Sequence, residues 1–80
     1  MPSRILIIED EPAQRRILEE MVKRLDCEAI TAGDGQQGLD ILASPQGAGV
    51  DLVLLDLVMP GMDGHQFLEK MNAIRGDLPV

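Results

Sequence analysis

Short apolar runs alternate along the chain with longer stretches of helical periodicity. Residues 5–8 form an uninterrupted run rich in isoleucine, which is typical of a strand buried on both faces of a parallel sheet. Residues 28–32 are a weaker strand candidate, and residues 50–55 form a third run that is apolar apart from Asp51. The pattern therefore predicts three short strands.

A helix is predicted between the first and second strands. Pro12 suits the first turn of this helix, because an N–H group there would have no hydrogen-bond partner within the helix. We expect Arg15 and Arg16 on its solvated face. The apolar positions are spaced as one helical stripe and are Ala13, Ile17, Leu18, Met21, Val22 and Leu25.

A second helix is predicted over about residues 36–43, with Asp34 as its N-cap. Leu39 and Leu42 should face the core. Gly38 should weaken the helix by up to about 1 kcal/mol relative to alanine, and we expect no further role for it.

A loop is expected over residues 44–49 because serine, proline and glycine dominate it. A third helix follows, capped by Asp63, and residues 78–80 resemble the approach to another strand. Strands that alternate with helices predict a parallel sheet with right-handed crossovers. The expected inward residues of the third helix are Phe67, Leu68, Met71 and Ile74.

Acidic residues follow two of the three predicted strands. Glu9 and Asp10 end the first, and Asp56 ends the third. A single acid in such a place is usually a turn or capping residue. The carboxyl ends of parallel strands share one edge, however, so these three would converge if the two strands are neighbours. Converging carboxylates repel one another, and Mg²⁺ with its preference for oxygen ligands relieves that repulsion.

Charge and composition exclude several classes of function. A net charge of −7 and a single aromatic residue, Phe67, argue against nucleic-acid binding by this segment. The one cysteine, Cys27, allows no intrachain disulfide, which suits a cytoplasmic protein. We expect no signal peptide and no membrane partner, since no apolar run is long enough.

Three segments together resemble the receiver domain of bacterial two-component response regulators. They are residues 5–11 (ILIIEDE), 32–35 (AGDG) and 51–64 (DLVLLDLVMPGMDG), in the family's order and spacing. The resemblance implies an α/β, flavodoxin-like (CheY-like) fold. Its open parallel sheet would have strand order 2-1-3 in the part present, with helices on both faces.

The resemblance also implies roles for individual residues. Asp56 falls on the phosphoacceptor position, and Asp10 on the direct ligand of Mg²⁺. Glu9 falls on the acid that holds the metal through water, and Val58 on the position that binds it through its backbone carbonyl. The chain would be a signalling protein and not an enzyme. A sensor histidine kinase or phosphotransfer protein would supply the phosphoryl group, and an output domain, with transcriptional regulation expected, would receive the signal. A homodimer is also an open expectation.

The family's domain has five strands, whereas residues 1–80 should contain its first three βα units and the start of the fourth strand. The family's phosphate-sensing Ser/Thr and its Lys lie beyond that point.

Two other functions fit the residues less well. A phosphatase of the haloacid dehalogenase type would need a second acid at the position of Val58. A flavin-binding module would not place the acids Glu9, Asp10 and Glu11 beside a phosphate. A degenerate receiver that acts only as an interaction module stays open as the alternative.

Overall fold

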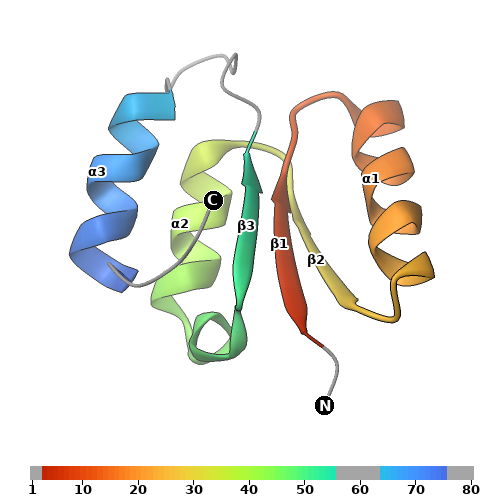
Figure 1. Cartoon of the computed structure of the whole chain (residues 1–80). Helices are drawn as coiled ribbons and strands as arrows, with labels where there is room; N and C mark the ends of the chain where they lie inside the picture. The colour runs from red at the N-terminus through yellow and green to blue at the C-terminus, as the bar shows by residue number, and fades with distance from the viewer. Residues whose placement is uncertain (1–2, 56–63, 76–80) are drawn as a thin grey trace.

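The structure is a computed structural model and describes residues 3–55 and 64–75. A three-stranded parallel sheet lies at its centre, with strand order β2-β1-β3. The strands are β1 (Arg4–Ile8), β2 (Glu28–Ala32) and β3 (Leu52–Leu55). Helix α1 (Pro12–Arg24) lies on one side of the sheet, and α2 (Gly35–Ala43) and α3 (Gly64–Arg75) lie on the other (Figure 1). The predicted order and fold class are confirmed.

The boundaries depart from prediction mainly around β3. The strand begins at Leu52 and not at residue 50, because the Val50 N–H donates to the Gly47 carbonyl at 3.2 Å. That bond closes a 3₁₀-helix, η1 (Pro45–Gly49), in the segment predicted to be a plain loop. Pro45 begins this helix at a position that needs no N–H. Helix α2 begins one residue before the predicted start, and its cap is as predicted, with the Asp34 carboxylate accepting from the Gln37 N–H at 2.8 Å.

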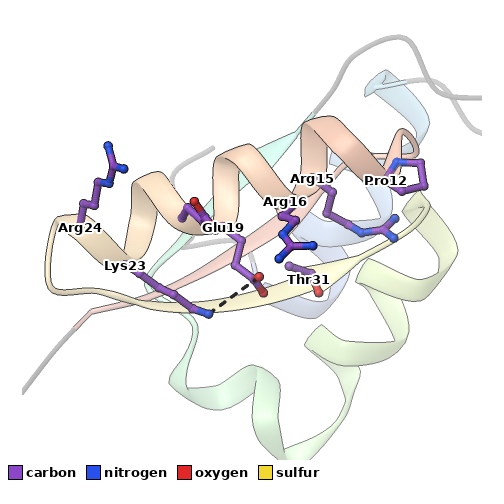
Figure 2. Close-up of a pocket in the computed structure, with 8 residues that line it drawn as sticks. Pro12, Arg15, Arg16, Glu19, Lys23, Arg24 and Thr31 are labelled. Carbon is purple, nitrogen blue, oxygen red and sulfur yellow. Dashed lines mark ion pairs between the residues drawn. The ribbon is translucent and has the colours of Figure 1, made fainter.

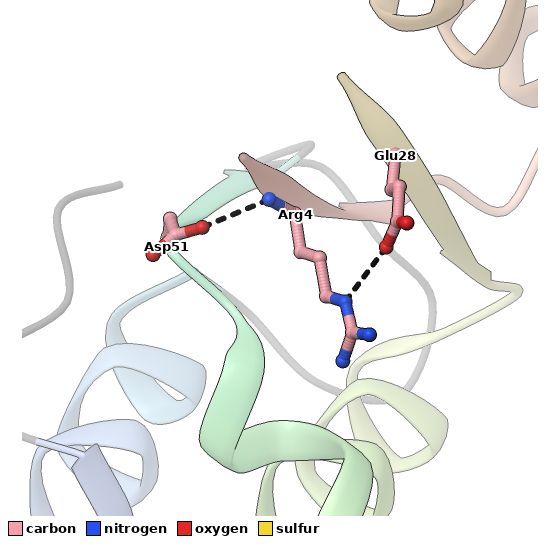
Figure 3. Close-up of polar contacts among 3 residues, drawn as sticks. All are labelled: Arg4, Glu28 and Asp51. Atoms are coloured by element: carbon pink, nitrogen blue, oxygen red, sulfur yellow. Dashed lines mark hydrogen bonds and ion pairs between the residues drawn. The ribbon is translucent and has the colours of Figure 1, made fainter. Parts of the chain in front are cut away.

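Arg4 ties the three strands together at the amino ends of the sheet (Figure 3). Its main-chain N–H donates to the Asp51 carboxylate at 2.9 Å, and its carbonyl accepts from the Asp51 N–H at 2.8 Å. Its guanidinium Nε donates to Glu28 Oε2 at 2.7 Å. The side-chain ion pair is half-exposed, so its contribution to stability is small.

The larger part of the core lies between the sheet and helices α2 and α3. Leu6 and Ile8 of β1 meet Phe67 and Met71 of α3 there, all at most 2% exposed. The prediction for α3 is wrong at Ile74, which is 40% exposed. The buried members of this cluster are Leu6, Ile8, Ala32, Leu39, Leu42, Val50, Val53, Phe67 and Met71.

Gly38 does more than weaken α2, which corrects the prediction made for it. The residue is buried, and a Cβ atom placed on it would lie 2.4 Å from Ile8 Cδ1 and 3.5 Å from Phe67 Cε2. The missing side chain therefore lets α2 approach β1 closely. The packing requirement is a tertiary one, and helix propensity alone does not reveal it.

Candidate functional site

The candidate site lies at the carboxyl edge of the sheet, where β1 gives way to α1. Ile8 pairs with Ala32 of β2 and with Leu55 of β3, so the three strands reach this edge at the same level. Glu9 follows Ile8 directly and is only 7% exposed. Asp56, which follows Leu55 in the sequence, lies outside the described residues, as does Val58.

Hydrogen bonds to Ala32, Glu11 and Arg15 are among the contacts that hold Glu9 in place. Its main-chain N–H donates to the Ala32 carbonyl at 3.2 Å, which continues the β1–β2 ladder by one residue. Its carboxylate Oε1 accepts from the Glu11 N–H at 3.1 Å. Its own carbonyl accepts from the Arg15 guanidinium at 3.1 Å. Burying a carboxylate is costly without compensating partners, and the Glu11 N–H is one such partner for Glu9.

Asp10 and Glu11 complete the acidic turn, with different roles. Asp10 is exposed to solvent beside Glu9. Glu11 is the N-cap of α1, and its carboxylate accepts from the Ala13 N–H at 3.1 Å. A carboxylate at a helix N-terminus is stabilised by the unpaired N–H groups and by the helix dipole. Glu11 is therefore committed to capping, which leaves Glu9 and Asp10 as the acids of the turn that suit a metal.

The structure brings Arg15 to this edge, which the sequence interpretation missed. Arg15 was expected on a solvated helix face, yet it is half-buried and its guanidinium bonds the Glu9 carbonyl. A Cβ atom on Gly33 would lie 3.3 Å from the same guanidinium, so the β2–α2 turn also lies beside it. Side chains on a helix point back toward its N-terminus, and that rule could have indicated that Arg15 reaches the turn.

The oxygen-rich donor set fits a small divalent cation. Glu9 and Asp10 carry carboxylates at the end of β1, and carboxylates are the ligands that Mg²⁺ prefers. Within residues 3–55 and 64–75, no group of three or more His, Cys, Asp or Glu side chains is arranged to hold a metal. The predicted third carboxylate, Asp56, is not among those residues.

The family model for the response regulator receiver domain matches residues 5–80 of this chain. The chain belongs to this family. Sporulation initiation phosphotransferase F of Bacillus subtilis is 36% identical over 80 residues, which cover all of this chain and 62% of that protein. Other curated relatives are much longer, and the chain spans as little as 8% of their length.

Solved structures of the family share the fold. The response regulator protein TrrA of Thermotoga maritima, in complex with Mg²⁺-BeF, is 32% identical with a TM-score of 0.82. The alignment covers 95% of this chain and 64% of that one. A complex of histidine kinase ThkA with TrrA matches with a TM-score of 0.84 and 33% identity, over 95% of this chain and 63% of the matched one.

Among the described helices, none has the length and apolar character needed to span a membrane.

His65, in the first turn of α3, is exposed, as expected for a solvent-facing helix residue.

Proposed function

We propose that this chain is the phosphoacceptor part of a response regulator and that it takes up a phosphoryl group on Asp56 with Mg²⁺. The observation that carries the proposal is the buried carboxylate of Glu9, held at the end of β1 beside the strand that leads into Asp56. Residues 1–80 would be a partial receiver domain, its first three βα units and the approach to the fourth strand.

The chemistry is nucleophilic displacement at phosphorus by a carboxylate. An oxygen of Asp56 bonds to the phosphorus of a phosphohistidine, and the P–N bond breaks with its electron pair left on the histidine nitrogen, which takes up a proton. Later a water oxygen bonds to the phosphorus, the bond to Asp56 breaks and inorganic phosphate leaves. Glu9 and Asp10 would hold Mg²⁺ together with Asp56 and the Val58 carbonyl. The bound ion neutralises the charge that gathers on the phosphoryl oxygens.

Two relatives support the partner and the cofactor. One solved relative is a complex of a histidine kinase with a response regulator, and another holds Mg²⁺-BeF. We therefore propose a sensor histidine kinase or phosphotransfer protein as the donor. The output would be transcriptional regulation in the cytoplasm, through a domain outside this chain.

The test is intact mass spectrometry after incubation with acetyl phosphate or phosphoramidate, with and without Mg²⁺. We expect one phosphoryl addition that requires Mg²⁺ and disappears in Asp56→Asn. Asp51→Asn is the matched control, because it makes the same change just before the opposite end of β3, where the Asp51 carboxylate accepts from the Arg4 N–H. Asp10→Asn and Glu9→Gln should raise the Mg²⁺ concentration needed, since each removes one carboxylate.

Two results would contradict the proposal. Phosphorylation that persists in Asp56→Asn would place the acceptor elsewhere. No addition, either to this chain or to a version extended by the family's two further strands, would favour the alternative of a degenerate receiver that acts only as an interaction module.

A further inference from the structure

Two hollows of about 600 Å³ each follow the outer edge of β2. The first lies between α1 and β2 (Figure 2), and the second continues along the amino end of β2. Lys23 lines both, so they form one groove, which we call the β2 groove. Its lining includes Thr31 from the carboxyl end of β2, and Ala29 and Ile30 from the rest of the strand.

The backbone of β2 is open along this groove. The Glu28 N–H donates to the Ser3 carbonyl at 2.8 Å, and the Ala32 carbonyl accepts from the Glu9 N–H at 3.2 Å. Both residues therefore turn their polar groups toward β1. In a parallel pair, successive residues of a strand direct their N–H and C=O groups to opposite sides of that strand. Ala29 and Thr31 alternate with the residues that bond β1, so their N–H and C=O groups point outward. Within the described part of the chain, β1 is the one strand paired with β2.

Basic side chains gather along the same groove although the chain as a whole is acidic. Its lining holds five of the seven Lys and Arg residues and three of the fourteen Asp and Glu residues. Figure 2 shows Arg16 and Lys23 extending from α1 toward β2, with Thr31 beneath Arg16. Lys23 lies 3.8 Å from Glu19, and Arg16 forms no ion pair with any described residue. The charge of Arg16 is therefore available to a ligand that reaches the strand edge, and Lys23 is held only by a long ion pair in which its own side chain is exposed.

We propose that the β2 groove binds an extended, acidic peptide segment of a partner protein by β-strand addition. Main-chain groups of the segment pair with Ala29 and Thr31, and its carboxylates approach Arg16 and Lys23. In this mode of recognition the main-chain bonds give affinity and the side chains give specificity. The residues that would bind the peptide lie outside the acidic turn at Glu9, although Arg15 borders both surfaces, and binding does not depend on phosphorylation.

Two other occupants fit the groove less well. A nucleic acid fits less well because no aromatic side chain lines the groove to stack with its bases. A second copy of this chain, related by two-fold symmetry, would place the same basic surface against itself.

The test uses a fluorescein-labelled decapeptide in which threonine and glutamate alternate. Its fluorescence anisotropy is measured as the chain is added, without Mg²⁺ or phosphodonor. We expect binding that weakens at least about tenfold when lysine replaces glutamate, or when proline replaces every second threonine. Lys23→Glu should weaken binding by about tenfold as well. Lys70→Glu is the matched control, because it makes the same change at an exposed position on α3.

The predicted main-chain hydrogen bonds between the peptide and β2 can be measured separately. Amide exchange at Ala29 and Thr31, measured by NMR, should be fast in the free chain and slow once the acidic peptide is added. Thr31→Pro removes an outward N–H and no bond to β1, so it should abolish binding while the circular dichroism spectrum is retained.

Any of four results would overturn the proposal. They are no binding of the acidic peptide, equal binding of the lysine peptide, equal losses in Lys23→Glu and Lys70→Glu, and unchanged exchange at Ala29 and Thr31. A single-stranded oligonucleotide is titrated in parallel, and its tighter binding would identify a nucleic-acid surface instead.

Discussion

Strand β1 sends alternate side chains to two faces of the sheet that are packed very differently. Leu6 and Ile8 point to the face covered by α2 and α3, where nine buried residues of the described part of the chain form one cluster. Ile5 and Ile7 point to the face covered by α1, where Val22 is the only other buried member of the described cluster. Equally apolar side chains from one strand thus enter a thick core on one side and a thin one on the other.

The difference extends to the helices themselves. Phe67 and Met71 of α3 are almost fully buried, whereas Ile17 and Met21 of α1 and its C-cap residue Leu25 are 54%, 56% and 72% exposed. The predicted apolar stripe of α1 is therefore only partly a core stripe, since Val22 and half-buried Leu18 carry its contact with the sheet. Periodicity identifies a helix, but the number of elements packed against it decides how much of its stripe is buried.

The largest expected effect is on the face under α2 and α3. Phe67→Ala removes a ring that is 0% exposed and leaves a cavity between α3 and the sheet. We expect a loss of about 3–5 kcal/mol in the free energy of unfolding, which for a small domain is a large share of the total. Urea unfolding followed by circular dichroism measures it, and a loss below about 1 kcal/mol would show that this face is not the main core.

The α1 face should respond less and more selectively. Val22→Ala should lower the free energy of unfolding by about 2 kcal/mol, because it removes two buried methyl groups. Met21→Ala, the neighbouring control, should change it by less than about 1 kcal/mol, since that side chain is 56% exposed. Equal losses in the same urea experiment would mean that Met21 is buried in solution and would remove the contrast between the two faces.

The smallest change in the free energy of unfolding is expected where α2 packs against β1. Gly38→Ala improves helix propensity by about 1 kcal/mol, but the added Cβ meets the Ile8 side chain, and such overpacking costs about 1–3 kcal/mol. We expect a net loss of about 1 kcal/mol in urea unfolding. Adding Ile8→Val removes the Cδ1 atom and should recover part of that loss relative to Ile8→Val alone. A more stable Gly38→Ala chain would show that propensity outweighs the close contact.

The candidate site was predictable in part. Glu9 and Asp10 could be singled out because they follow a wholly apolar run, and the structure places Glu9, buried, at the edge expected for them. Glu11 and Arg15 were not recognised. A capping carboxylate and a guanidinium that bonds a main-chain carbonyl look, in sequence, like any other charged residues on a helix. The roles proposed for Asp56 and Val58 stay predictions.

By itself the sequence determined the order of the elements, the cap at Asp34 and the acidic end of β1, because each depends on residues close together in the chain. It also indicated a parallel sheet, because strands that alternate with helices pair in parallel through right-handed crossovers. The tertiary structure alone decided which apolar residues of α1 stay exposed, why position 38 excludes a side chain, and where β3 begins. It also created the β2 groove, where α1 places Arg16 and Lys23 along an open strand edge. These features depend on how closely elements distant in sequence approach one another, and local patterns do not contain that information.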